Sequence, residues 1–411
     1  MENDRLILGE GQYYSMDCYT TKLNNNVLVV GASGSGKTRS IVTPNLLQAY
    51  GSYIVSDPKG NLYSKYKNYL ESKGYAVQKL DFTDPDNSEG YNFFDYIQNT
   101  QDIIKISHMM MQSREGERHL DPFWDEAAQL LIQSLIAFLI ENGREEDRNL
   151  GGIQRLLTLC QVNEYNPDTK SPLDKLMEHI QADDPGSFAA KSYVKFRIAA
   201  GKTLKSILIT VNSRIGLFDT PEINRMTGLD TINIPAIGRR KTALFVVVSD
   251  TDRSMDTLAN LFFTQAMNEL CLYADKNCPD NRLPIPVRFI MDDFATNCKI
   301  AEFPRMISSI RSRGISAMLM LQAESQLESS YGRDWSTIIA NCDTYVYTGG
   351  NDVETAKAVA TRCDMPVQEV LNMPVGNIWI FRRGQEPING RLFDIEPFLD
   401  EKLAEGYEQA M

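Results

Sequence analysis

Apolar and polar positions in the first part of the chain alternate between strand-like and helix-like patterns. The strand-like runs are 26–31, 52–57 and 75–82. The two segments between them, 37–50 and 61–74, carry apolar residues at helical spacing, and Pro44 is expected to kink the first. This order of strand, helix, strand, helix and strand predicts a parallel sheet.

The middle of the chain carries the helical pattern alone. Pro, Gly or Ser opens or closes each apolar segment there, as is typical of helix ends. The predicted helices are 123–143, 153–162, 171–182, 187–199 and 202–218. This block predicts an all-helical insertion.

Strand patterns return in the last part of the chain. The run 242–249 is nearly all apolar, which is typical of a strand buried on both faces. A helix over 254–276 and further strands follow, at 287–293, 316–322, 344–349 and 377–384. We therefore expect an α/β fold: a nucleotide-binding domain in two parts, 1–91 and 230–411, interrupted by an all-α domain over 92–229.

Composition narrows the class of protein. The 411 residues are 43% hydrophobic and 23% charged, which is typical of globular chains. The formal net charge of −12 argues against general nucleic-acid binding, so any DNA contact must come from a local basic patch. Seven cysteines without CxxC spacing indicate reduced thiols rather than disulfides or a zinc site. We find no apolar run approaching the ~20 residues of a membrane span, so we expect a soluble, cytosolic chain.

The segment GASGSGKT, residues 31–38, fits the GxxxxGK[ST] phosphate loop in full. It stands between a predicted strand and a predicted helix, which is the context that the motif requires. We expect Lys37 to reach the β- and γ-phosphates of ATP and the Thr38 hydroxyl to bind Mg²⁺. The expected nucleotide-binding residues are Gly31, Ala32, Ser33, Gly34, Ser35, Gly36, Lys37, Thr38 and Arg39.

Two acidic residues end a later apolar strand in the sequence FIMDDFA. In ATPases with a phosphate loop the first acid holds Mg²⁺ and the second polarises the attacking water, which assigns these roles to Asp292 and Asp293. Asp293 is one methylene shorter than the more usual Glu, so turnover is expected to be slow. Gln322 ends the next strand. In a parallel sheet it would lie beside the acid pair and sense the γ-phosphate.

The combined segments resemble type IV coupling proteins, the TraG/TraD-type DNA-translocating ATPases of conjugation. The resemblance runs from about residue 25 to 390 and rests on segments that occur in the family's order. These are GASGSGKT, SDPKGNLY, GYAVQKLDFTDPDNSEGYNFFDYI, DPFWDEAAQLLIQSLI and FIMDDFATNCKIAEFPRMISSIRSRGISAMLMLQAESQL.

The resemblance implies a RecA-like ATPase core with an inserted all-α domain. It further implies a homo-hexameric ring at the cytoplasmic side of the bacterial membrane. This ring would recruit relaxase-bound single-stranded DNA and drive it by ATP hydrolysis into the channel of the type IV secretion system. Coupling proteins carry N-terminal transmembrane helices that are not found here, so membrane contact would need a missing anchor or a separate partner.

Site residues carried over from the family are Lys37, Thr38, Asp292, Asp293 and Gln322. Arg311 matches the family's arginine that reaches the nucleotide of a neighbouring subunit, and Arg313 is the close alternative. An arginine supplied by a neighbour implies weak hydrolysis by an isolated monomer.

Several alternatives stay open at this point. The basic segment 191–214 contains Tyr193 and Phe196, which either stack on DNA bases or belong to a solvated helical face. Asp57 lies either beside the nucleotide or in a structural turn. The chain is either a DNA-translocating ATPase or a nucleotide-binding substrate receptor with little hydrolysis. A small-molecule kinase or a GTPase is disfavoured because the sequence has no NKxD-type guanine motif.

Overall fold

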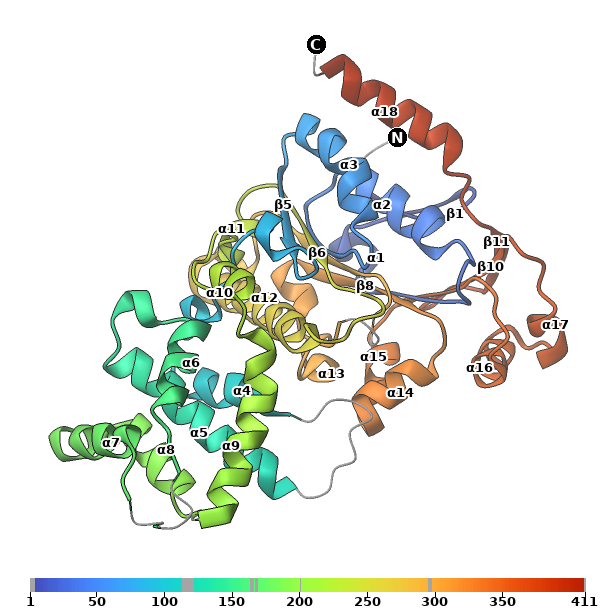
Figure 1. Ribbon diagram of the computed structural model, residues 1–411. Coiled ribbons are helices and arrows are strands. Elements are labelled where there is room, and N and C mark those ends of the chain that lie inside the picture. Colours follow the sequence, from blue (N-terminus) through green and yellow to red (C-terminus); the bar gives the residue numbers. More distant parts are fainter. Residues whose placement is uncertain are drawn as a thin grey trace. The chain divides into compact units, whose positions relative to one another are not determined.

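The computed structural model describes residues 4–112, 122–162, 166, 169–199, 201–294 and 298–409, and the chain forms two compact units (Figure 1). The sheet unit consists of 1–83 and 233–411, and the helical unit consists of 84–232. The helical unit is longer than the expected 92–229 because its ends bond to its own helices. The backbone N–H of Tyr91, for example, donates to the Met226 carbonyl at 2.8 Å.

The strands found among the described residues all belong to the sheet unit. They are β1 (Arg5–Gly9), β2 (Gln12–Ser15), β3 (Val27–Val30), β4 (Ser52–Ser56), β5 (Ala76–Asp81), β6 (Thr242–Val247), β7 (Val287–Met291), β8 (Ile315–Leu321), β9 (Thr344–Tyr347), β10 (Asn377–Arg382) and β11 (Ile388–Arg391). β1 and β2 form a separate antiparallel hairpin.

Nine strands form one sheet in the order β11-β10-β9-β3-β8-β7-β4-β6-β5. All pairs from β9 to β5 are parallel, and β10 is antiparallel to both of its neighbours, β9 and β11. The expected α/β fold with a mainly parallel sheet is confirmed. β8 pairs with both β3 and β7. It therefore lies between β3, which precedes the phosphate loop, and β7, which precedes the acid pair.

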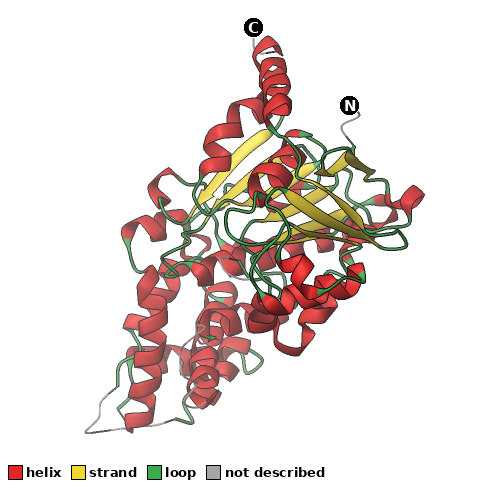
Figure 2. Ribbon diagram, turned by 90° about the vertical axis from the view of Figure 1, so that its right-hand side faces the viewer, coloured by secondary structure: helices red, strands yellow, loops and turns green. Residues whose placement is uncertain are grey.

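Helices flank the sheet, as Figure 2 shows. The helices of the sheet unit are α1 (Cys18–Thr21), α2 (Thr43–Leu47), α3 (Asn61–Ser72), α11 (Ile234–Ile237), α12 (Asp256–Asn277), α13 (Phe303–Met306), α14 (Ser325–Tyr331), α15 (Trp335–Ala340), α16 (Val353–Cys363), α17 (Val367–Leu371) and α18 (Glu396–Gln409). One large buried cluster joins apolar residues of β1, α2, α3 and β10 to the central strands.

The described part of the helical unit contains seven α-helices. They are α4 (Thr100–Met111), α5 (Pro122–Glu141), α6 (Leu150–Thr158), α7 (Pro172–Asp183), α8 (Phe188–Phe196), α9 (Gly201–Ile215) and α10 (Pro221–Met226). α5 is the central helix, because α4, α6, α8 and α9 all pack against it.

One described helix, Phe123–Glu141, is long and apolar enough to cross a membrane by length and composition alone. The expectation that no apolar run approaches this length therefore needs correction for α5. Leu131, Ile132, Leu135 and Ile136 of this helix are fully buried inside the helical unit. This burial is the ordinary environment of a core helix.

Candidate functional site

The phosphate loop is fixed to the strands on both sides of it. The Gly31 N–H donates to the Leu321 carbonyl at 3.1 Å, and the Ala32 N–H donates to the Gly349 carbonyl at 2.8 Å. A Cβ on Gly31 would lie 1.9 Å from Thr348 Oγ1, so only glycine fits there. Gly31 and Ala32 therefore anchor the loop.

The lysine of the loop is held by backbone oxygens. Lys37 is 7% exposed, and its Nζ donates to the carbonyls of Gly31 at 2.5 Å and Ala32 at 3.0 Å. Burial lowers the pKa of Lys37, while the carboxylates of Asp293 and Asp292 act in the opposite direction. A cation with this little hydration is well placed to bind an anionic phosphate.

The loop and the acid pair meet directly. Thr38 begins a π-helical turn, Thr38–Val42, and its Oγ1 donates to Asp292 Oδ2 at 2.7 Å. Asp292 and Asp293 follow the last residue of β7, and Asp293 adopts the left-handed conformation with φ of 52°. Burial raises the pKa of Asp292, and the bond from Thr38 offsets part of this rise.

The hydroxyl of Thr38 and the carboxylate of Asp292 are a donor pair that fits Mg²⁺. Magnesium prefers oxygen ligands and takes one or two protein ligands beside phosphates and water. Thr38 Oγ1 and Asp292 Oδ2 are 2.7 Å apart, and both residues line a hollow beside the loop. The chemistry and the placement of these oxygens therefore fit Mg²⁺, and their role as its ligands stays a prediction.

A hollow of about 530 Å³ lies in front of these residues, which is large enough for a nucleotide. Gln322 lines it together with Asp292, Asp293 and the loop residues 33–39. The prediction that the ends of β7 and β8 are neighbours is confirmed by their parallel pairing. The role of Gln322 as a phosphate sensor stays a prediction.

Asp57 combines both of the positions considered for it. It follows β4 and lines the hollow, and it is 3% exposed. Its Oδ2 accepts the backbone N–H of Tyr63 at 2.9 Å in the first turn of α3. Burial raises the pKa of Asp57, and the helix N–H groups reduce this effect. Its contacts are therefore those of a structural turn in the wall of the site.

A second hollow of about 200 Å³ adjoins the loop and was missed by sequence reasoning. It shares Gly34, Ser35, Gly36 and Arg39 with the larger hollow, and Val375, Leu392 and Phe393 give it an apolar wall. Arg39 also pairs with Glu396 at the start of α18. These apolar residues lie outside the helices and strands and belong to no motif, so no signal in the sequence pointed to them.

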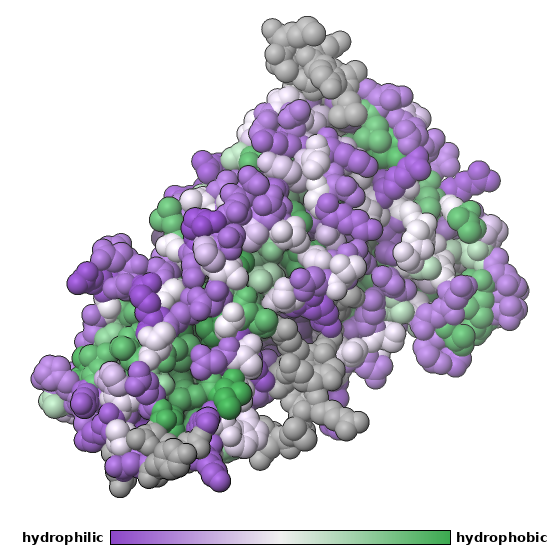
Figure 3. Space-filling model, viewed as in Figure 1, coloured by the Kyte–Doolittle hydropathy of each residue, from purple (hydrophilic) through white to green (hydrophobic). Residues whose placement is uncertain are grey.

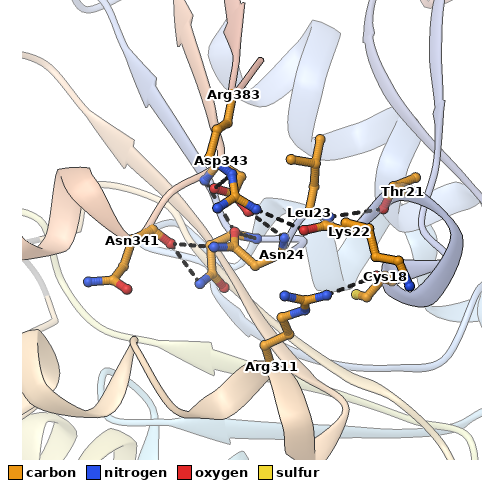
Figure 4. Close-up of polar contacts among 10 residues, drawn as sticks. Cys18, Thr21, Lys22, Leu23, Asn24, Arg311, Asn341, Asp343 and Arg383 are labelled. Atoms are coloured by element: carbon orange, nitrogen blue, oxygen red, sulfur yellow. Dashed lines mark hydrogen bonds and ion pairs between the residues drawn. The ribbon is translucent and has the colours of Figure 1, made fainter. Parts of the chain in front are cut away.

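Arg311 lies away from this site, at the amino edge of the sheet. It stands in the short turn Ile310–Arg313 before β8, and its Nη2 donates to the Cys18 carbonyl at 2.9 Å (Figure 4). Arg313 makes a two-pronged contact with Asp275, at 2.8 and 2.7 Å. Within one chain, Arg311 is therefore not brought to the phosphate loop, and its expected role across a subunit interface stays a prediction.

Neither of the two alternatives for Tyr193 and Phe196, stacking on DNA bases or a solvated helical face, holds in this structure. They are 4% and 1% exposed, because they face the interior of the helical unit. Arg197 pairs with Asp174, and Arg214 pairs with Asp125. The basic side chains of this segment that remain exposed are Lys191, Lys195, Lys202 and Lys205.

The sequence profile of the family described as "Type IV secretory system Conjugative DNA transfer" matches residues 2–370. The VirD4 coupling protein of Bartonella henselae is 20% identical over 387 residues, covering 89% of this chain and 57% of that protein. A TraG conjugal transfer protein of Escherichia coli is 23% identical over 359 residues, covering 81% of this chain and 54% of that protein. The chain spans about half the length of the curated relatives it matches.

Solved structures share the fold. The conjugative coupling protein TrwBdeltaN70, in complex with sulphate, has a TM-score of 0.65 and 18% identity, covering 89% of this chain and 85% of that one. TrwB in complex with ADP and Mg²⁺ has a TM-score of 0.64 and 18% identity, with the same coverage. The profile match extends over most of the sequence, and the chain therefore belongs to the family of type IV secretory system conjugative DNA transfer proteins.

Proposed function

We propose that the chain is a coupling ATPase of a conjugative type IV secretion system. It recruits relaxase-bound single-stranded DNA and drives DNA transfer by ATP hydrolysis. Family membership supports the DNA-transfer role, and the TrwB structures with ADPNP and with ADP plus Mg²⁺ support the choice of nucleotide and metal.

One observation carries the proposal: the 2.7 Å contact between Thr38 and Asp292. It joins the phosphate loop to the acid pair across most of the chain, so both halves of an ATPase site stand at one hollow. Lys37 binds the phosphates, and Thr38 with Asp292 holds Mg²⁺. When bound by these residues, Mg²⁺ would neutralise charge on the phosphate oxygens.

The remaining residues complete the reaction. Asp293 orients the attacking water and accepts its proton, and Gln322 contacts the γ-phosphate. The smaller apolar hollow, with Val375 and Phe393, receives the nucleoside. Arg311 reaches the nucleotide of a neighbouring copy and stabilises the charge of the transition state. The proposed working assembly is a homo-hexamer at the cytoplasmic side of the bacterial membrane, in which each copy would supply this arginine to its neighbour.

The test is ATP turnover with and without single-stranded DNA. We expect Lys37→Ala to lower turnover roughly 10²-fold or more, because the phosphates lose their cation. Lys357→Ala removes an exposed lysine that pairs with Glu354, and it serves as the matched control with unchanged turnover. Full turnover by Lys37→Ala would contradict the proposed site.

A second candidate is a nucleotide-binding receptor that hydrolyses little ATP. The specific observation in its favour is Asp293, a short acid in a left-handed backbone conformation. DNA separates the two candidates: stimulation of turnover by single-stranded DNA supports the translocating ATPase. Nucleotide binding without turnover, with or without DNA, supports the receptor.

A further inference from the structure

A small cavity of about 40 Å³ lies at the amino ends of β7 and β8. Three arginines line it, Arg282, Arg288 and Arg311, and none of the described residues in its wall is Asp or Glu. The phosphate loop faces the carboxyl ends of the same strands. By the rise of a parallel strand, Arg288 and Asp292 are about 13 Å apart along β7. The cavity is therefore separate from the ATPase site.

Arg288 is a buried cation in a central strand. It is 7% exposed, and its Nε donates to Ser316 Oγ at 3.3 Å while its Nη2 donates to Met16 Sδ at 3.1 Å. None of the described carboxylates pairs with it. Tyr53 cannot supply the missing charge, because burial raises its pKa to about 12. A buried charge with neutral partners alone is unfavourable, and it becomes favourable once an anion binds beside it.

The two other arginines also have mainly neutral contacts. Arg311 donates to the Cys18 carbonyl, whereas nearby Arg383 pairs with the Asp343 carboxylate at 2.9 Å (Figure 4). Arg282 lies over the ring of Tyr19, with 5.0 Å between guanidinium and ring centre. Arg282 also interacts electrostatically with the exposed carboxylate of Asp17. The positive charge of the cavity is thus not neutralised by its own wall, in a chain whose net charge is −12.

We propose that this cavity binds a phosphate-class dianion through Arg288, Arg311 and Arg282. Planar guanidinium groups match phosphate oxygens with paired hydrogen bonds, and three positive charges favour a dianion over a single carboxylate. The volume corresponds to about three water molecules by the same measure, so the cavity admits a phosphoryl group and excludes a nucleoside. The ligand is either free inorganic phosphate or the terminal phosphate of a nucleotide held by another copy.

Binding is tested by thermal unfolding of the full chain in inorganic phosphate at constant ionic strength. The background is Lys37→Ala, which weakens phosphate binding at the loop and makes this test independent of ATP turnover. We expect millimolar phosphate to raise the Tm, and acetate to leave it unchanged. Arg288→Gln and Arg311→Gln are each expected to weaken phosphate binding at least tenfold.

Arg313→Gln is the matched control, because Arg313 belongs to the same turn but pairs with Asp275 outside the cavity wall. If Arg288→Gln fails to fold, the double variant with Arg282→Gln and Arg311→Gln replaces it, and ³¹P line broadening reports binding directly. Unchanged phosphate binding in these variants, or no effect of phosphate in the Lys37→Ala background, overturns the proposal.

A second arm identifies the source of the phosphate. Lys37→Ala chains, which carry the intact arginines, are mixed with ATP-loaded Arg311→Gln chains, which carry the intact phosphate loop. Association that depends on ATP and is lost in Arg288→Gln assigns the site to a neighbour's nucleotide. Binding of inorganic phosphate without such association assigns it to the free anion. If neither inorganic phosphate nor a neighbour's nucleotide binds at this cavity, the proposal is overturned.

Discussion

The position of the Asp293 side chain depends on the local backbone geometry. Its φ of 52° is in the left-handed region, which Asp and Asn tolerate better than other residues with a Cβ. This conformation turns the chain directly after Asp292 and leaves both acids in the wall of the hollow. The sequence supplied the identity of the pair, but not this turn.

The left-handed conformation makes Asp293→Asn a clean test of the carboxylate. We expect turnover to fall roughly 10²–10³-fold, because a positioned base contributes on this scale. The Tm should change little, since Asn adopts the same backbone. Asp293→Ala adds backbone strain and should also lower the Tm. Equal turnover of Asp293→Asn and the unaltered chain would remove Asp293 from the reaction.

Asp292 gives a prediction about pH. Burial raises its pKa above the ordinary 3.8. The folded state therefore loses stability as the pH rises from the ordinary pKa through the raised one, because the buried carboxyl group becomes charged. Asp292→Asn removes this charge and keeps an oxygen for the Thr38 hydroxyl. At pH 7, without nucleotide, we expect the variant to unfold at a Tm roughly 2 °C higher while losing turnover.

The size of this stability difference should depend on pH. Both proteins are uncharged at this position below the ordinary Asp pKa, so the advantage of Asp292→Asn should shrink as the pH falls toward that value. Calorimetric scans of both proteins across this range measure the difference. An advantage that grows on acidification would show that burial of Asp292 is not its cause.

At the scale of elements, patterns with strong local signals were predicted well. The strands before the phosphate loop and the acid pair are short apolar runs, and the structure has them as β3 and β7. The helix predicted over 37–50 is instead a π-helical turn followed by α2, which ends at Leu47. Pro44 stands in the first turn of α2, where proline is tolerated.

Elements that depend on distant partners were missed. β1 and β2 form a hairpin that packs against the main core, and β11 is an edge strand of only four residues. Their strand character comes from pairing rather than from a long pattern. α4 was also missed, although Asn99 caps it and Ile103, Ile106 and Met110 mark its buried face. A search for caps would have found this helix.

α5 gives a prediction at the scale of an element. Leu135 is fully buried at its middle, so Leu135→Ala should lower the free energy of unfolding of the helical unit by about 2–5 kcal/mol. Hydrogen exchange of α5 amides in the full chain measures this change. Glu126→Ala, at an exposed position of the same helix, is the control. Unchanged protection in Leu135→Ala would show that the stability of α5 does not depend on this packing.

At the scale of the whole molecule, charge limits how DNA can be bound. The face in Figure 3 is mostly hydrophilic, with hydrophobic side chains gathered over part of the helical unit. A chain with net charge −12 repels DNA except where basic side chains gather, as on α8 and α9.

Removing two exposed lysines of that region tests this view. For Lys195→Ala with Lys202→Ala, we expect weaker single-stranded DNA binding, with a salt-dependence slope smaller by about 1.4. Lys170→Ala, which removes an exposed lysine paired with Glu178, should leave the slope unchanged. Affinity measured at several salt concentrations gives the slopes, and equal slopes in all proteins would exclude this region from the DNA path.

β8 runs from the turn Ile310–Arg313 at one edge of the sheet to Gln322 at the other, over about 23 Å of extended chain. It is hydrogen-bonded on both sides, to β3 and to β7, and so behaves as a stiff rod. A shift of β8 along its own axis would therefore move both of its ends in the same direction and by the same amount. A movement of Gln322 and a movement of Arg311 would then be coupled through β8. Such a coupling would link the nucleotide bound at one edge of the sheet to an anion bound at the opposite edge.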